Sequence, residues 1–187
     1  MNNKTTSLSQ QLKWMGWILA VMLVIELVNI VSGRMLSSYG ILPRSIPSIG
    51  FIFSAPFIHG SIGHFASNMV TLGVFVMCML QFGNKRFVQV SGLLIVMTGL
   101  AVWLFGRTAI HIGASGVIYG YFGYLLLAGL LSRRLFLTVI SVFVGIFYGT
   151  MIFGVLPSYP YVSWESHLFG FISGLILAYF LRRRRPA

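Results

Sequence analysis

Apolar residues along this chain gather in long runs that are separated by short polar or basic segments. Each run is close to the roughly 20 residues that an α-helix needs to cross the hydrocarbon core of a bilayer. The runs predict six membrane-spanning helices, over residues 14–31, 63–80, 87–105, 114–131, 135–156 and 164–181. We therefore expect an all-α polytopic membrane protein, folded as a six-transmembrane-helix bundle.

One long connection, residues 32–62, interrupts this pattern. It contains Pro43, Pro47 and Pro56 and is apolar only in patches. Backbone polar groups cannot face lipid without hydrogen-bond partners, so we expect this segment to lie in the interface or to re-enter the membrane. The predicted organisation is a cytoplasmic N-terminal segment (1–13), a six-span domain (14–181) and a basic cytoplasmic tail (182–187).

Composition agrees with a lipid-facing surface. Charged residues make up 8% of the chain, against about 25% in soluble domains, too few to wet a water-facing surface. The 13 Lys and Arg against two acidic residues give a net charge of +11. Such an excess is also typical of nucleic-acid binding, but here the basic residues lie between apolar runs, where they anchor and orient spans. We expect the bilayer as a partner, and no nucleic acid.

The same basic residues predict an orientation. The two ends of the chain and the connections after the second and fourth spans hold ten of the 13. The side of the membrane richer in Lys and Arg is normally cytoplasmic. We therefore expect both termini in the cytoplasm, with the first apolar run retained as a span.

Polar residues recur at one end of three spans. With this orientation the second, fourth and sixth spans begin at the outer face, and their first turns carry His64 and Asn68, Ser115, and His167. A serine hydroxyl is a poor nucleophile unless a base takes its proton and donors stabilise the oxyanion. The pattern predicts Ser115 as nucleophile and His167 as base. His64 and Asn68, four residues apart on one helix face, are the predicted oxyanion donors.

Glycines surround the predicted nucleophile. Gly113 and Gly116 flank Ser115 and allow a close backbone approach where the fourth span begins. Small residues also recur at helical spacing on the fourth and sixth spans, at positions 116, 120, 123, 170, 174 and 178. In lipid, such stripes let two helices approach closely. We therefore expect these two spans to pack together, with Ser115 within reach of His167 and Tyr119 against its ring.

Three motifs together resemble the rhomboid family of intramembrane serine proteases. They are HxxxN at 64–68, GASG at 113–116 and HxxGxxxG at 167–174, and the likeness covers roughly residues 40–180. It implies a compact rhomboid-like six-helix bundle. The chain contains no Asp, which excludes a Ser-His-Asp triad; a third member would have to be a glutamate, and a Ser-His dyad is the simpler expectation. The resemblance implies the same roles for the residues above, with the Ser115 N–H as a further oxyanion donor, and adds His59 as a supporting histidine.

The resemblance also implies an activity. Family members cleave single-span membrane proteins near the outer end of the substrate helix, without a cofactor or a metal, and this chain is similar to the minimal bacterial form. That form implies a bacterial inner membrane location. One departure is the outer loop, where some members carry a Trp-Arg pair and this chain has only Arg44; the usual loop contacts are therefore not assigned. The sequence carries no signal for the oligomeric state or the natural substrate.

Several residues also fit other interpretations. Ser115 alone is typical of helix packing, Tyr119 of an ordinary core, and His59 of a structural hydrogen bond as much as of a site role. His111 is interpreted as a loop histidine near the interface. Glu26 lies inside the first span, so it must be protonated or paired, and a structural hydrogen bond is favoured.

Two other functions compete with proteolysis. An inactive rhomboid-like protein that binds membrane clients would have the same fold, although such relatives typically lose the serine or the histidine. A small transporter or channel would distribute polar residues through the depth of the membrane, whereas here they cluster at one end.

Overall fold

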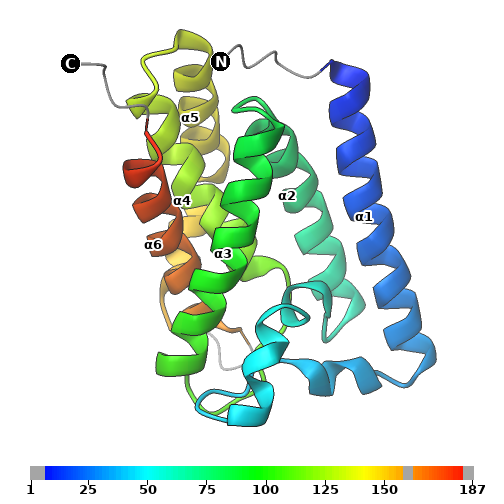
Figure 1. The fold of residues 1–187 in the computed structure, drawn as a ribbon. Helices are drawn as coiled ribbons and strands as arrows, with labels where there is room; N and C mark the ends of the chain where they lie inside the picture. The colour runs from blue at the N-terminus through cyan, green and yellow to red at the C-terminus, as the bar shows by residue number, and fades with distance from the viewer. Residues whose placement is uncertain (1–6, 158–161, 183–187) are drawn as a thin grey trace.

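The structure is a computed structural model that describes residues 7–157 and 162–182. This part of the chain is nearly all helical and has no β-strand beyond an isolated bridge between Ile41 and His111. Its α-helices form a bundle (Figure 1) and are α1 (Leu8–Val31), α2 (Ile62–Leu80), α3 (Asn84–Phe105), α4 (Ser115–Leu131), α5 (Leu135–Tyr148) and α6 (Trp164–Phe180). Short 3-10 helices are η1 (Met35–Tyr39), η2 (Ile46–Ile52), η3 (Ala55–Phe57) and η4 (Gly149–Val155).

The helices have the length and apolar character of membrane spans. Four stretches of the described chain are long and apolar enough to cross a bilayer, namely α1, α2, α3 and α5 continued by η4. The other two, α4 and α6, have 17 residues each. At 1.5 Å per residue they reach about 26 Å, less than the hydrocarbon thickness of about 30 Å. The predicted polytopic six-helix bundle is confirmed, with two of its helices shorter than a full crossing.

The helix α4 is the centre of the bundle. Every residue from Ser115 to Leu125 is buried, and Figure 1 shows α4 enclosed by α3, α5 and α6. In contrast, α1 lies at the edge and buries only Gln11, Met22, Glu26 and Asn29. A helix that is apolar all round belongs in a core, whereas one with a narrow buried stripe faces lipid over most of its surface.

Glycines allow α4 and α6 to pack at close range. A Cβ atom on Gly170 would overlap the carbonyl of Gly116, and one on Gly174 would overlap the carbonyl of Gly120. Any side chain at these two positions would therefore push the helices apart. The predicted contact between the fourth and sixth spans is present, and it brings the first turns of α4 and α6 together.

Two helix boundaries differ from the prediction. First, α1 begins at Leu8 rather than Trp14, because the Ser7 hydroxyl caps it and accepts a hydrogen bond from the Gln10 N–H at 3.4 Å. Second, the fifth span is not one α-helix to residue 156: α5 ends at Tyr148 and continues as η4. Glycine is a poor α-helix former, and η4 begins at one glycine and contains another, Gly154.

The connection between α1 and α2 is folded against the bundle. Its residues Ile41, Ile52 and Ala55 form a small second core with Val102 of α3. Gly99 of α3 has no side chain where Ile52 packs, and a Cβ there would overlap the isoleucine. This agrees with the expected interfacial or re-entrant segment in that the connection is packed rather than free.

Arg44 holds this connection to the end of α3. Its guanidinium donates hydrogen bonds to the carbonyls of Leu104 at 3.3 Å and Gly106 at 2.8 Å. Beside it, the Trp103 indole N–H donates to the Ser45 carbonyl at 2.9 Å. The loop contacts that the sequence left unassigned are thus made by Arg44 and by Trp103 of α3, which join the connection to the end of that helix.

Candidate active site

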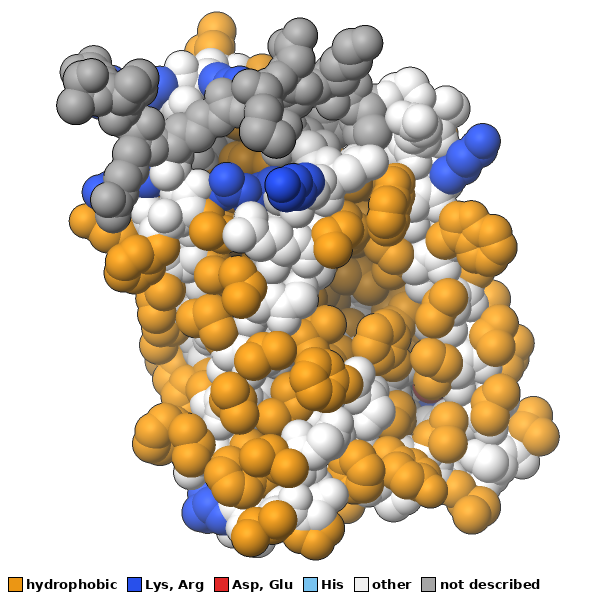
Figure 2. Space-filling view, viewed as in Figure 1, with side chains coloured by type: hydrophobic (Ala, Val, Ile, Leu, Met, Phe, Trp, Pro, Cys, Tyr) orange, Lys and Arg blue, Asp and Glu red, His pale blue; other side chains and the backbone are white. Residues whose placement is uncertain are grey.

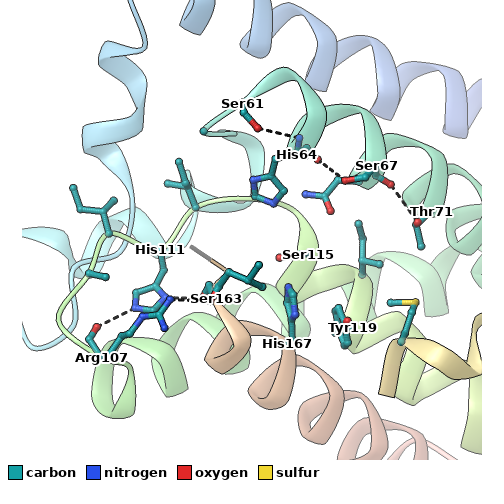
Figure 3. Close-up of a pocket in the computed structure, with 18 residues that line it drawn as sticks. Ser61, His64, Ser67, Thr71, Arg107, His111, Ser115, Tyr119, Ser163 and His167 are labelled. Carbon is teal, nitrogen blue, oxygen red and sulfur yellow. Dashed lines mark hydrogen bonds between the residues drawn. The ribbon is translucent and has the colours of Figure 1, made fainter. Parts of the chain in front are cut away.

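A cavity of about 800 Å³ lies at the end of the bundle opposite the start of α1 and the end of α6. Its walls come from α2, the 107–112 loop, α4, η4 and the start of α6 (Figure 3). The predicted residues that line it are His64, Asn68, Ser115, Tyr119 and His167. The bundle therefore brings together the side chains that the sequence placed at the first turns of three spans.

The start of α2 sets the positions of His64 and Asn68. The Ser61 hydroxyl caps the helix and accepts a hydrogen bond from the His64 N–H at 3.1 Å. This fixes His64 in the first turn and Asn68 one turn further on the same face. The Nδ2 atom of Asn68 is buried and has no hydrogen-bond partner in the described chain. A buried unpaired donor is costly, so one that lines a cavity is available to an incoming oxygen.

Gly113 brings the backbone that enters α4 against these two side chains. It has a φ of +112°, which side chains rarely adopt. A Cβ atom here would lie 2.6 Å from Cε1 of His64 and 3.5 Å from Nδ2 of Asn68. Only glycine allows both the backbone conformation and this approach. The two candidate donors therefore lie next to the backbone that precedes Ser115.

Ser115 is the first residue of α4 and is 8% exposed. The first N–H groups of a helix have no partners within the helix and favour negative charge nearby. Gly116 has a different purpose: a Cβ there would lie 3.1 Å from Cγ2 of Thr98 and 3.4 Å from the Ser166 carbonyl oxygen. Gly116 thus permits helix packing behind the serine and does not line the cavity.

His167 is held in one tautomer and orientation. Its Nδ1 lies 2.9 Å from the Gly154 carbonyl oxygen; because a carbonyl can only accept, Nδ1 carries the proton and Nε2 has a free lone pair. The Tyr119 ring stacks on the imidazole with a centroid distance of 4.0 Å and an angle of 7°. In Figure 3 the imidazole points toward the Ser115 hydroxyl.

No hydrogen bond joins the Ser115 hydroxyl to His167 within residues 7–157 and 162–182. In resting enzymes such bonds are often long and tighten only when substrate binds. The cavity therefore holds a serine hydroxyl and an oriented imidazole, without a hydrogen bond between the two in the described residues.

Gly154 is a site residue that sequence analysis missed. Its carbonyl orients His167, and a Cβ on it would overlap the Tyr119 hydroxyl. A backbone carbonyl thus contacts Nδ1 of this histidine, the atom that a carboxylate contacts in a Ser-His-Asp triad. The only cue in the sequence was a glycine near the end of the fifth span.

His59 lies behind the cavity wall rather than in it. It is completely buried, and its Nε2 accepts a hydrogen bond from the Ala114 N–H at 3.4 Å. Its ring meets that of His64 edge to face, with centroids 5.2 Å apart. Burial, and next the proximity of His64, lower the pKa of His59 to about 4, so it is neutral at pH 7. Of the two interpretations of His59, a structural hydrogen bond or a role in the site, these contacts favour the structural hydrogen bond.

The first span holds the backbone of His59. The His59 carbonyl accepts hydrogen bonds from Nδ2 of Asn29 at 2.9 Å and from the Arg34 guanidinium at 2.7 Å. Arg34 in turn forms a 3.0 Å ion pair with the buried carboxylate of Glu26. Glu26 is thus paired, as its position in a span required, and through Arg34 it is connected to the carbonyl of His59.

The opposite wall is a hydrogen-bonded chain that sequence analysis did not predict. Nε2 of His111 donates to the Arg107 carbonyl at 3.1 Å, so its Nδ1 accepts from the Ser163 hydroxyl at 2.6 Å. The Ser166 hydroxyl lies 2.6 Å from that of Ser163. Burial lowers the pKa of His111. His111 is in a loop, as expected, but it is buried and lines the cavity.

Comparison with known proteins gives a consistent family. The Rhomboid domain model matches residues 48–184. An uncharacterised protein of Mycobacterium tuberculosis is 33% identical over 87% of this chain and 71% of its own length, and one of Mycobacterium leprae is 31% identical over 94% and 76%. RHOMBOID-like protein 1 of Arabidopsis thaliana is 29% identical over 68% of this chain and 33% of its own length.

Proposed function

The chain belongs to the rhomboid family, and we propose that it is an intramembrane serine endopeptidase with Ser115 as nucleophile and His167 as general base. One observation carries the proposal: Nδ1 of His167 donates to the Gly154 carbonyl, which leaves the Nε2 lone pair free in the cavity that Ser115 lines. An imidazole held in this tautomer can take the proton of a hydroxyl.

In the first step Nε2 of His167 takes the Ser115 proton as Oγ attacks the substrate carbonyl carbon. The imidazole becomes positively charged, and the Gly154 carbonyl and the Tyr119 ring face that charge at 2.9 Å and 4.0 Å. Both contacts favour a cation, because a carbonyl oxygen and an aromatic face are electron-rich. These two contacts therefore favour the imidazolium that forms in this step.

The carbonyl oxygen becomes an oxyanion in the tetrahedral intermediate. The Asn68 amide, the His64 ring and the Ser115 N–H are the donors we assign to it. The unpaired state of Asn68 Nδ2 supports this assignment, since the donor breaks no hydrogen bond when it binds the oxyanion. Donors that are already oriented stabilise developing charge without reorganisation.

Collapse of the intermediate breaks the peptide bond. His167 gives its proton to the leaving amine, and Ser115 is left as an acyl ester. Water, deprotonated by His167, then attacks the ester carbon; the bond to Oγ breaks, His167 returns the proton to Oγ, and the second product leaves as a carboxylic acid. Both halves use the same base, so a dyad suffices.

We infer that the substrates are single-span membrane proteins cut near the outer face, in an inner membrane where the termini of this chain are cytoplasmic. The cavity lies at one end of the bundle, which suits a bond near the end of a substrate helix. A helical backbone hides its carbonyls in hydrogen bonds, so the substrate must unwind locally. Gly or Pro near the cleaved bond would favour this.

The test is labelling by a fluorophosphonate, which forms a phosphorus–Oγ bond with an activated serine and releases fluoride. Intact mass should show one adduct on the wild-type protein in detergent. Ser115→Ala and His167→Ala should show none. Ser67→Ala is the control, because Ser67 lines the same cavity but has no assigned role. No labelling of folded wild-type protein would overturn the proposal in favour of an inactive client-binding relative. Equal labelling of Ser115→Ala would overturn Ser115 as the nucleophile, because another residue would then form the adduct.

A further inference from the structure

Three arginines converge on a second cavity at the opposite end of the bundle. Arg86 lies in the first turn of α3, Arg134 immediately precedes α5 and Arg182 follows α6. All three line a cavity of about 120 Å³. We propose that this cavity binds the phosphate group of an anionic phospholipid.

Two of these guanidinium groups are held in place by the protein. Arg86 donates hydrogen bonds to the Leu181 carbonyl and, at 3.4 Å, to the Tyr124 hydroxyl. The Arg182 guanidinium carbon lies 3.7 Å from the centre of the Tyr179 ring. Side chains that are ordered before binding lose less entropy when a ligand arrives. Two of the three guanidinium groups are therefore already positioned beside the cavity before an anion binds.

No acidic side chain neutralises the cluster. The chain has only two acidic residues, Glu26 and Glu165, and both lie near arginines at the active-site end. Figure 2 shows Lys and Arg side chains gathered at the end of the molecule where α1 begins and α6 ends. Like charges that share a cavity repel one another. A bound anion would relieve this repulsion.

The lining favours a phosphate that carries a hydrocarbon tail. Guanidinium groups form paired hydrogen bonds with phosphate oxygens. The remaining lining offers the hydroxyls of Tyr124 and Ser132 together with apolar side chains, which are Phe82, Ala128, Leu131, Leu137 and Ala178. The adjacent first turns of α5 expose Leu135, Phe136 and Val139 on the bundle surface. A headgroup among the arginines would thus have its acyl chains beside an apolar helix.

The predicted orientation fits this ligand. This is the end of the bundle that the excess of basic residues assigns to the cytoplasm, where anionic lipids attract basic segments. The inference does not depend on catalysis, since none of the cavity residues lines the candidate active site.

The experiment compares lipid binding by delipidated protein in a neutral detergent, using native mass spectrometry and melting temperature. Phosphatidylglycerol should bind one to one and raise the melting temperature, whereas phosphatidylcholine with the same acyl chains should do neither. The double variant Arg134→Gln/Arg182→Gln should bind phosphatidylglycerol at least about tenfold more weakly. Arg86 is left intact because it joins α3 to α4 and to the end of α6.

The matched control is Lys85→Gln/Arg133→Gln, which removes the same charge from the same end but outside the cavity lining. It should bind phosphatidylglycerol like the wild type. Equal loss in both double variants would mean diffuse surface attraction and would overturn the site. Inorganic phosphate that stabilises the protein as much as phosphatidylglycerol would overturn the lipid as ligand. If the first double variant does not fold, Arg134→Gln alone undergoes the same comparison.

Discussion

At the scale of single residues, Asn68 combines two properties that separate catalysis from stability. Its buried amide nitrogen has no partner in the described chain, so Asn68→Ala removes an unsatisfied donor and should leave the melting temperature unchanged or higher. If it donates to the oxyanion, turnover should fall by about 10²-fold, with little change in half-saturation. His64→Ala should lower turnover in the same way. A raised half-saturation with normal turnover would instead mean that these residues only hold substrate.

His59 predicts a dependence of stability on pH. Its pKa is about 4 in the folded protein and 6.5 when unperturbed. Below pH 6.5 His59 binds a proton in the unfolded chain but stays neutral in the folded chain. The free energy of unfolding therefore falls as the pH falls from 6.5 to about 4. The loss reaches at most about 3 kcal/mol. The neighbouring His64 and Arg34 both lower the pKa of His59 as well. Neither therefore changes the direction in which stability depends on pH.

The measurement is the melting temperature of wild type and His59→Gln in detergent between pH 7.5 and about 4.5. Glutamine can still accept from the Ala114 N–H but does not titrate. The variant should therefore lose less stability on acidification than the wild type, while the three other histidines titrate in both. Parallel curves would show that His59 is not the titrating group.

The sequence predicted which side chains meet in the cavity, but not the backbone groups and distant partners that position them. Ser115, His167, His64 and Asn68 line the cavity, and each could be proposed because it is a reactive or donating side chain at the start of a span. Gly154 acts through its carbonyl, which every residue has. His111 is positioned by a serine 52 residues away in sequence, a separation that periodicity cannot detect.

At the scale of helices, the contact between α4 and α6 can be tested without replacing any candidate catalytic residue. Gly174→Ala places a methyl group on the Gly120 carbonyl and should lower stability by about 1–3 kcal/mol. Activity should fall as well, because α6 carries His167. Gly92→Ala is the control, because Gly92 lies in α3 and a Cβ added there would meet no atom within 4 Å. A Gly174→Ala protein that melts and labels like the control would mean that the helices tolerate a wider spacing.

The helices themselves were predictable from hydropathy, because a lipid solvent demands long apolar segments. The change from α5 to η4 was not, because hydropathy does not distinguish an α-helix from a 3-10 helix. The glycines that begin and interrupt η4 weaken α-helix formation there, and the carbonyl of one of them, Gly154, contacts His167 of another helix.

At the scale of the whole molecule, the distribution of basic residues predicts the sidedness of the fold. In a Cys78→Ala background, Ser9→Cys should react with an impermeant maleimide only from the cytoplasmic side of membrane vesicles. Ser38→Cys, near the active-site end of α1, should react only from the other side. Both serines are exposed in the structure. Labelling of both from one side would contradict the six-span topology.

The hydrogen bond between α1 and the His59 carbonyl bears on how long a piece of the chain is needed to form the candidate site. The recognisable family sequence begins at residue 48, yet Asn29 and Arg34 hold the carbonyl of the histidine that supports the start of α4. A fragment that begins at residue 48 would keep the candidate site residues but lose the two hydrogen bonds from Asn29 and Arg34 to the His59 carbonyl. The segment that the family model matches is therefore shorter than the segment that these hydrogen bonds join. The boundaries of a shortened chain follow from these hydrogen bonds and from the longer likeness to the mycobacterial relatives, which reaches 94% of the chain, rather than from the family model alone.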